Sequence, residues 1–232
     1  MTLEKILQSQ GFGSRKQCRQ LIWDGRVSVA GRLISDANQD LPCEGLIFSV
    51  DGKEWTFRRQ LYIGLHKPPD YECSRKPSHH PGILTLLPQE YVNRNIQPVG
   101  RLDHGTTGLL LLSDDGGFIH AQSSPKRHIS KTYEATLFEA VTPQLLAQLR
   151  EGVKLIDEDK PIAAQVRKLD THLLELSIDQ GKYHQVKRML AAAGNHCVSL
   201  RRSAIGKLTL DSLGLPMGQW CHLEPGQMAL LV

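Results

Sequence analysis

Four consecutive leucines, Leu109–Leu112, place the strongest constraint on what this chain can fold into. They lie within the stretch GRLDHGTTGLLLLSDDG, which runs from Gly100 to Gly116. Because successive side chains of a strand point to opposite faces of a sheet, an unbroken apolar run predicts a strand buried on both faces. A lone carboxylate, Asp103, precedes this strand in a loop rich in glycine and threonine. A carboxylate in such a place is either paired or kept reactive.

The spacing alone leaves the role of Asp103 open. It fits a turn-capping residue, a metal ligand, a general base or a nucleophile, and Arg101 is near enough in sequence to pair with it. His79 and His80 invite a metal site, but no third ligand follows at a suitable spacing. The chain also lacks a phosphate-binding P-loop and a dinucleotide-binding fingerprint. We therefore expect neither a metal nor a cofactor.

The pattern of predicted elements indicates an α+β fold. Residues 61–232 contain two predicted helices, 143–151 and 183–193. Few helices between strands favour a mainly antiparallel sheet. In the second helix, Val186, Met189 and Leu190 have the spacing of a buried stripe. The predicted strands are 62–66, 108–113, 132–137, 163–169 and 172–178.

The first 55 residues read as a separate small module. Leu3, Ile6 and Leu7 mark one short helix, and a second helix begins after Ser14 and ends before Gly25. A hairpin over 26–34 and a strand over 46–50 follow. We expect an α/β module over residues 1–58 and a larger domain over residues 59–232.

Positive charge is concentrated in particular stretches, although the net formal charge is only +4. Residues 14–32 hold five basic residues and one acid, which fits a solvated helix face and a phosphate-contacting surface equally well. Residues 181–207 hold six basic residues and no acid. That imbalance fits phosphate neutralisation, or a cation held against a buried carboxylate. In the stretch 123–135, Tyr133 follows three basic residues and is either a base-stacking platform or an ordinary strand tyrosine.

The N-terminus and the cysteines indicate the compartment. The N-terminus has no apolar signal core, and the apolar runs are far too short to span a bilayer. The five cysteines are widely spaced and form no Cys-x-x-Cys pair, so a disulfide framework and structural zinc are not expected. We expect a cytoplasmic protein with reduced thiols and no membrane partner.

The order of these motifs resembles a known family. The stretch SRKQCRQLIWDGRVSVAGRLI, residues 14–34, resembles the S4 RNA-binding module. The GRLD motif at 100–103, TGL at 107–109, KTY at 131–133 and GKYHQVKRM at 181–189 resemble the pseudouridine synthases. Tyr-His-Gln at 183–185 favours the ribosomal small-subunit pseudouridine synthase A family over the large-subunit relatives. The resemblance covers nearly the whole chain.

The resemblance implies a cofactor-independent isomerase that converts a uridine of 16S ribosomal RNA to pseudouridine. Asp103 matches the catalytic aspartate, Tyr133 the aromatic residue that stacks on the uracil, and Lys187 the basic residue that pairs with the aspartate. We expect a monomer that binds small-subunit ribosomal RNA, as free RNA or as ribonucleoprotein. The expected substrate and RNA contacts are Arg15, Lys16, Arg19, Arg26, Lys67, Arg101, Lys131, His184, Arg188 and Arg201.

Two alternatives stay open at this point. One is the same reaction on 23S ribosomal RNA. The other is a non-catalytic S4-type RNA-binding factor that acts in ribosome assembly. Such a factor would need the basic surfaces, but it would not need the set formed by Asp103, Tyr133 and Lys187.

Overall fold

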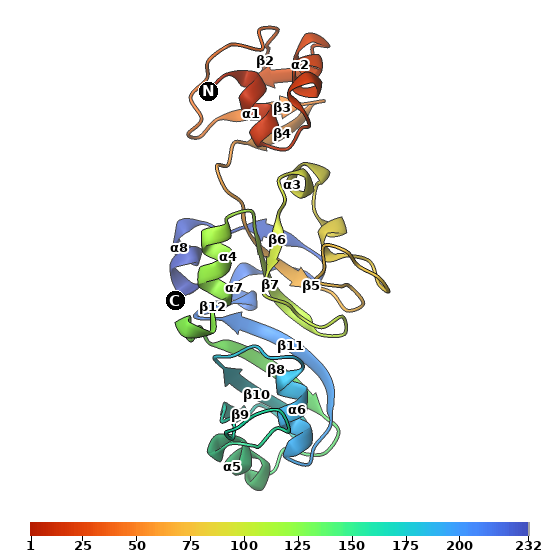
Figure 1. Ribbon diagram of the computed structural model, residues 1–232, viewed down its shortest axis with the longest axis vertical. Coiled ribbons are helices and arrows are strands. Elements are labelled where there is room, and N and C mark those ends of the chain that lie inside the picture. The colour runs from red at the N-terminus through yellow and green to blue at the C-terminus, as the bar shows by residue number, and fades with distance from the viewer. Residues whose placement is uncertain (232) are drawn as a thin grey trace. The chain divides into compact units, whose positions relative to one another are not determined.

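The computed structural model describes residues 1–231 (Figure 1). The contacts between residues divide the chain into two compact units. The first, here called the N-terminal unit, contains residues 1–61 and 84–97. The second, here called the large unit, contains residues 62–83 and the rest of the chain from residue 98. Each unit is described by itself.

The N-terminal unit begins with two short helices, α1 (Leu3–Ser9) and α2 (Arg15–Trp23). The Ser14 hydroxyl accepts a hydrogen bond from the Gln17 backbone, and the Gln17 side chain accepts one from the Ser14 backbone. This capping box starts α2 where the sequence predicts, and Gly25 follows it with a φ of +67°. A four-stranded antiparallel sheet completes the unit, in the order β2 (Arg32–Leu33), β1 (Val27–Val29), β3 (Ile47–Val50) and β4 (Lys53–Thr56).

A later segment of the chain returns to this unit. It carries the short helix α3 (Gln89–Asn93), whose Tyr91 ring meets the Trp55 ring edge-on at 5.9 Å. The Asn93 amide donates to the Gly11 carbonyl at 2.8 Å. Gly11 has no room for a side chain, because a Cβ would lie 1.9 Å from the carbonyl oxygen of Glu90. The return of residues 84–97 was not predicted from the sequence.

The large unit is built on one nine-stranded sheet, whose main path runs β13-β5-β7-β11-β8-β10-β9. Strand β12 pairs with β11 beside this path, and β6 pairs with β7. The pairing of β7 with β11 is parallel, and the other pairings along the path are antiparallel. The α+β class with a mainly antiparallel sheet is thereby confirmed. The strands are β5 (Tyr62–Lys67), β6 (Gln97–Val99), β7 (Thr107–Ser113), β8 (Lys131–Leu137), β9 (Gln165–Lys168), β10 (Leu173–Ile178), β11 (Cys197–Ile205), β12 (Leu208–Thr209) and β13 (Trp220–His222).

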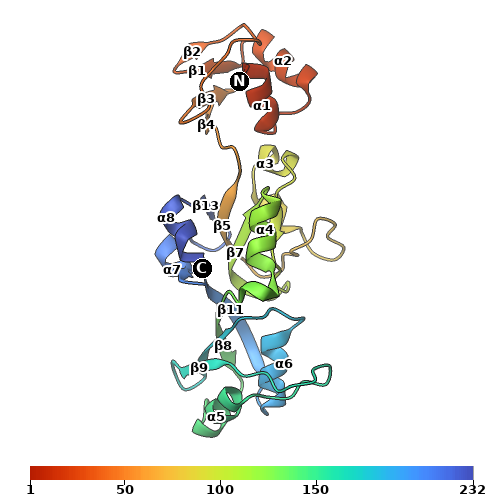
Figure 2. The ribbon, with the colours of Figure 1, turned by 60° about the vertical axis from the view of Figure 1, so that its left-hand side comes forward.

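Helices cover both faces of this sheet. Figure 2 shows α4 and α6 on one side of the strands and α7 and α8 on the other. Helix α5 is capped by Thr142, as predicted, but α6 begins only after His184, which has a left-handed φ of 47°. Within residues 1–231, no helix has the length and apolarity that crossing a membrane requires. The helices are α4 (Gly116–Ser123), α5 (Pro143–Glu151), α6 (Gln185–Ala192), α7 (Leu210–Leu213) and α8 (Pro225–Met228), with 3-10 turns at Ile83–Leu86, Pro125–Arg127 and Ala229–Leu231.

Strand β7 lies inside the sheet, and all four of its leucines are at most 1% exposed. This confirms the prediction that the leucine run forms a strand buried on both faces. Gly108 has a φ of +109°, and a Cβ there would lie 2.3 Å from the carbonyl oxygen of Arg202. Only glycine permits such a close approach of β11. The parallel pairing of Gly108 with Arg202 therefore brings β11 next to the loop that carries Asp103.

Candidate active site

A cavity of about 360 Å³ opens in the large unit. Its walls come from the loop 99–106, the end of α4, strands β8 and β11, and the start of α6. Asp103, Tyr133 and Lys187 all line it, although they are far apart in the sequence. The volume lies in the range of pockets that hold small molecules or single nucleotides. The fold thus brings the three residues that the sequence singled out to one cavity.

A buried lysine holds the loop that carries Asp103. Lys67, at the end of β5, is 0% exposed. Its ammonium donates to the carbonyl oxygens of Pro68 at 2.9 Å, His104 at 2.9 Å and Thr106 at 3.0 Å. An ammonium has three N–H groups, so these carbonyls use all of them. Two of the three acceptors, His104 and Thr106, closely follow Asp103, and Lys67 therefore holds the backbone on the C-terminal side of it.

This placement corrects the prediction that Lys67 contacts RNA. A side chain with no exposed surface and no remaining donor cannot reach a phosphate. Burial lowers the pKa of Lys67, while the Cys73, Asp70 and Asp103 side chains act in the opposite direction. The sequence favoured a surface position because lysine is rarely buried. Its role in the structure is to position the loop.

The carboxylate of Asp103 has a histidine beside it. His184 Nε2 lies 3.3 Å from Asp103 Oδ1, and both side chains are partly exposed, by 36% and 28% respectively. His184 holds its left-handed backbone at the start of α6, and the exposed Tyr183 ring stacks on its imidazole at 3.9 Å. A non-glycine residue in this conformation is strained, and such strain gathers at functional sites. The contact with Asp103 and the stack with Tyr183 hold the imidazole in this orientation.

Lys187 lines the same cavity from the first turn of α6. Among the residues that the structure describes, His184 is the side chain within ion-pair distance of Asp103, and Lys187 is not. The predicted pairing of Lys187 with Asp103 therefore stays a prediction. The carboxylate lies in a cavity where lysine and arginine side chains outnumber carboxylates, because Asp179 is the only other acid on its walls.

Tyr133 and Arg202 lie side by side in the sheet. They are directly opposite each other in the antiparallel pairing of β8 with β11, so their side chains share one face. Tyr133 is 7% exposed and Arg202 is 4% exposed. Both line the cavity, together with Lys131, whose pKa is lowered by burial and also by the charge of Arg202. This face of the sheet is the deep wall of the cavity.

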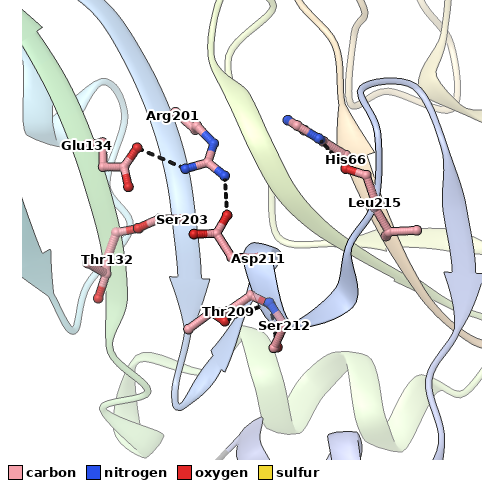
Figure 3. Close-up of polar contacts among 9 residues, drawn as sticks. All are labelled: His66, Thr132, Glu134, Arg201, Ser203, Thr209, Asp211, Ser212 and Leu215. Carbon is pink, nitrogen blue, oxygen red and sulfur yellow. Dashed lines mark hydrogen bonds and ion pairs between the residues drawn. The ribbon is translucent and has the colours of Figure 1, made fainter.

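The neighbouring residues of the same strands face away from the cavity. Arg201 donates to Glu134 at 2.9 Å and to Asp211 at 2.8 Å on the opposite face, as Figure 3 shows. The prediction that Arg201 contacts the substrate is wrong, because the alternation of the strand turns Arg202 inward instead. Arg202 is the site residue that the sequence analysis missed. Strand β11 was not predicted, so the alternation that separates the two arginines could not be read.

Several other predicted RNA contacts already have carboxylate partners. Arg15 and Arg19 both bind the buried Glu4, Arg26 binds Asp51, and Arg188 binds Asp157. Lys16 and Arg101 are exposed. RNA contacts by these six residues remain predictions. Among the described residues, no carboxylate lies within ion-pair distance of Lys16 or Arg101. Within residues 1–231, no group of three histidine, cysteine or acidic side chains is arranged to hold a metal ion.

The comparisons with known proteins agree with this geometry. Residues 61–192 match the family model of RNA pseudouridylate synthase, and residues 1–45 match that of the S4 domain. The chain is 37% identical to the ribosomal small subunit pseudouridine synthase A of Escherichia coli (strain K12), over all of both chains. It is 32% identical to an uncharacterized RNA pseudouridine synthase of Bacillus subtilis (strain 168), over 100% of this chain and 98% of the relative.

A solved structure shares the fold as well. The crystal structure of a pseudouridylate synthase superposes with a TM-score of 0.70, at 32% identity and with all of both chains covered. The family match covers the segments that supply Asp103, Tyr133 and Lys187 to the cavity. This chain therefore belongs to the RNA pseudouridine synthases, within the family of ribosomal small-subunit pseudouridine synthase A, and it carries an S4 domain at its N-terminal end.

Proposed function

We propose that this chain isomerises one uridine of 16S ribosomal RNA to pseudouridine, with Asp103 as the catalytic carboxylate. The observation that carries the proposal is the cavity itself. It joins a loop carboxylate, a buried tyrosine and the basic start of α6 in a space of about 360 Å³. A non-catalytic RNA-binding factor has no use for a carboxylate on a loop that a buried lysine, Lys67, holds by two hydrogen bonds to the backbone just after it.

The chemistry needs the residues that the cavity holds. Isomerisation breaks the bond between N1 and C1′ of the uridine, turns the base, and joins C5 to C1′. Asp103 acts on the ribose, either as a nucleophile at C1′ or as a base at C2′. Tyr133 gives the detached uracil a flat surface to lie against. No redox change or net hydrolysis occurs, so the reaction requires no cofactor.

Basic side chains on the cavity wall complement the charge of the Asp103 carboxylate. We assign this role to Lys187, with His184 at 3.3 Å orienting the carboxylate by its contact with Oδ1. The target uridine must leave its stack to enter the cavity, as happens in other enzymes that modify bases. Lys16, Arg101 and the N-terminal unit then serve to bind the surrounding RNA backbone.

The choice of 16S over 23S ribosomal RNA rests on relatives. Two full-length relatives, from Escherichia coli (strain K12) and Vibrio parahaemolyticus, carry the name ribosomal small subunit pseudouridine synthase A at 37% and 36% identity. Tyr183 and His184, whose rings stack on each other, belong to the segment whose resemblance favours this branch. We take 16S ribosomal RNA as the substrate, and we expect the protein to act as a monomer in the cytoplasm.

Tritium release from transcripts that contain 5-tritiated uridine tests the proposal. The C5 hydrogen leaves only when C5 becomes the glycosidic carbon. We expect the wild type to release tritium from 16S RNA, or from its ribonucleoprotein, and not from 23S RNA. Release from 23S RNA alone would move the substrate to the large subunit. No release from either RNA would favour the RNA-binding factor.

A further inference from the structure

Arg202 is a buried cation without a counter-ion. Its guanidinium donates once, from Nε to the carbonyl oxygen of Leu109 at 2.8 Å. Its Nη2 is buried and has no hydrogen-bond acceptor among the described residues. No carboxylate of the described chain lies within ion-pair distance of it, whereas the adjacent Arg201 has two. Most of the five N–H groups of a guanidinium are therefore left unused.

Such an arrangement is costly unless something completes it. Buried charges in folded proteins are paired, and buried N–H groups nearly always find an acceptor. Arg202 lines the cavity at 4% exposure, deeper than the Asp103 side chain at 28%. A ligand that reaches the deep wall of the cavity would supply the missing acceptor. Phosphates of an RNA chain stay at the mouth of such a cavity, while a flipped base fills its interior.

The register of the sheet identifies the part of the ligand that Arg202 meets. Arg202 lies directly opposite Tyr133, the proposed platform for uracil. A uracil on Tyr133 presents carbonyl oxygens at its edge, and these are acceptors. We propose that Arg202 donates from its free N–H groups to a carbonyl oxygen of the uracil and stabilises the negative charge of the base after it detaches. This inference rests on uridine isomerisation in the cavity.

The proposed step balances as follows. When the N1–C1′ bond breaks, its electron pair stays on the uracil, where N1 and the two carbonyl oxygens share the charge. Asp103 meanwhile bonds to C1′ or takes the C2′ proton. C5 then bonds to C1′ using an electron pair of the ring, while the Asp103–C1′ bond breaks or, on the other route, Asp103 returns its proton to C2′. The C5 proton passes to water, and N1 gains a proton from water. Arg202 keeps its proton throughout, and it lowers the barrier by meeting charge that is absent from the bound uridine.

The test compares the two adjacent arginines. Arg202→Met and Arg201→Met remove the same charge from the two faces of one strand, and Arg201 serves as the matched control because its partners lie outside the cavity (Figure 3). Single-turnover tritium release gives the rate constant, and filter binding gives the RNA affinity. We expect Arg202→Met to lose about 100-fold or more in rate, as when one donor to a developing anion is removed. Its RNA affinity should stay within about threefold of the wild type. Arg201→Met should keep the wild-type rate.

Two further measurements separate stabilisation of charge from support of the fold. Arg202→Lys restores a cation but not the planar fork, so we expect a rate between those of Met and arginine. Added guanidinium ion, at concentrations that leave the fold intact by circular dichroism, should raise the rate of Arg202→Ala and not that of Arg201→Ala. If Arg202→Met does not fold, Arg202→Lys and the guanidinium rescue decide the matter.

Three results would overturn the inference. If Arg202→Met lost RNA affinity but kept the wild-type rate, Arg202 would be a phosphate ligand. Equal rates for Arg202→Met and Arg201→Met, or no recovery of the rate with Arg202→Lys or with added guanidinium, would also contradict it. An inactive wild type on 16S RNA is a separate result. It would contradict the proposed substrate, and the same comparison would then be made on 23S RNA.

Discussion

One buried charge in each unit, Glu4 and Arg202, is treated in the opposite way. In the N-terminal unit, Arg15 and Arg19 converge on Glu4, whose side chain is 2% exposed, and Arg26 binds Asp51. In the large unit, Arg202 is 4% exposed and lines a cavity with no described carboxylate beside it. The charge of Glu4 is therefore neutralised within the N-terminal unit. The charge of Arg202 has no such partner in the large unit.

This difference shows why counting basic residues is a poor guide to an RNA-binding surface. A run such as SRKQCR contains three cations, but two of them serve the fold by neutralising Glu4. Removing the arginines would leave the Glu4 carboxylate buried without a partner, and an unpaired buried charge is strongly destabilising. A cation without a partner costs the fold stability that a bound ligand can restore. Variants of single charges can therefore separate the two uses.

The largest expected effect on stability comes from Lys67. Lys67→Met removes the donor from three carbonyl oxygens around the Asp103 loop. We expect it to lower the free energy of unfolding by about 3 kcal/mol, since each unsatisfied polar group costs about 1–3 kcal/mol. Urea denaturation measures this. Lys168→Met is the control, because Lys168 is exposed and donates to one carbonyl, that of Val141. Equal losses for the two variants would show that Lys67 does not hold the loop.

A smaller effect, which depends on pH, is expected at Glu4. Hydrogen bonds from Arg15 and then Arg19 lower the pKa of the Glu4 carboxyl below its ordinary value of 4.5. A lowered folded-state pKa stabilises the protein above the unfolded value, and this stability is lost as the pH falls through the folded value. Glu4→Gln should therefore be less stable at neutral pH and should lose less stability on acidification. Thermal unfolding between neutral and acid pH checks this, with Glu44→Gln as an exposed control. Parallel curves for Glu4→Gln and the wild type would contradict the pairing.

The smallest effect is expected at the surface of α2, where two neighbouring cations sharpen the comparison. Lys16 is exposed, and no described carboxylate pairs with it, whereas Arg15 binds Glu4. If Lys16 contacts a phosphate, Lys16→Ala should reduce the slope of log affinity against log salt by about 1, with little change in stability. Arg15→Ala should change stability more and the slope less. A salt titration of RNA binding measures the slope for both variants. A larger loss of slope for Arg15→Ala than for Lys16→Ala would show that the RNA contacts the paired arginine instead.

Much of the fold could be predicted because it depends on local patterns. The leucine run at 109–112 gives β7, and the Ser14 cap with its partner Gln17 gives the start of α2. Strand β11 could not be predicted in the same way. Its sequence CVSLRRSAI places two arginines at its centre, and the alternation of buried residues breaks at the irregularity between Cys197 and Ser199, where two exposed residues follow each other. Only the pairing with β7 and β8 makes it a strand.

In the candidate site, too, local motifs could be predicted from the sequence and long-range contacts could not. Motifs identify Asp103, Tyr133 and Lys187, because each belongs to a short pattern that can be read in order. The burial of Lys67 could not be predicted, because two of its three acceptors lie 37 and 39 residues away in the chain. The contact of His184 with Asp103 joins residues that are still farther apart in the sequence. Contacts of this kind exist only after the sheet has assembled.

The most direct test of the account is to measure rate and RNA affinity together for Asp103→Asn. Asp211→Asn is the matched control, because it makes the same change at a carboxylate that pairs with Arg201 (Figure 3) and does not line the cavity. We predict that Asp103→Asn releases no tritium from 16S RNA in a single turnover, while it binds that RNA as tightly as the wild type does. Asp211→Asn should retain both properties. Tritium release by Asp103→Asn at the wild-type rate would contradict the central claim that this carboxylate carries out the chemistry.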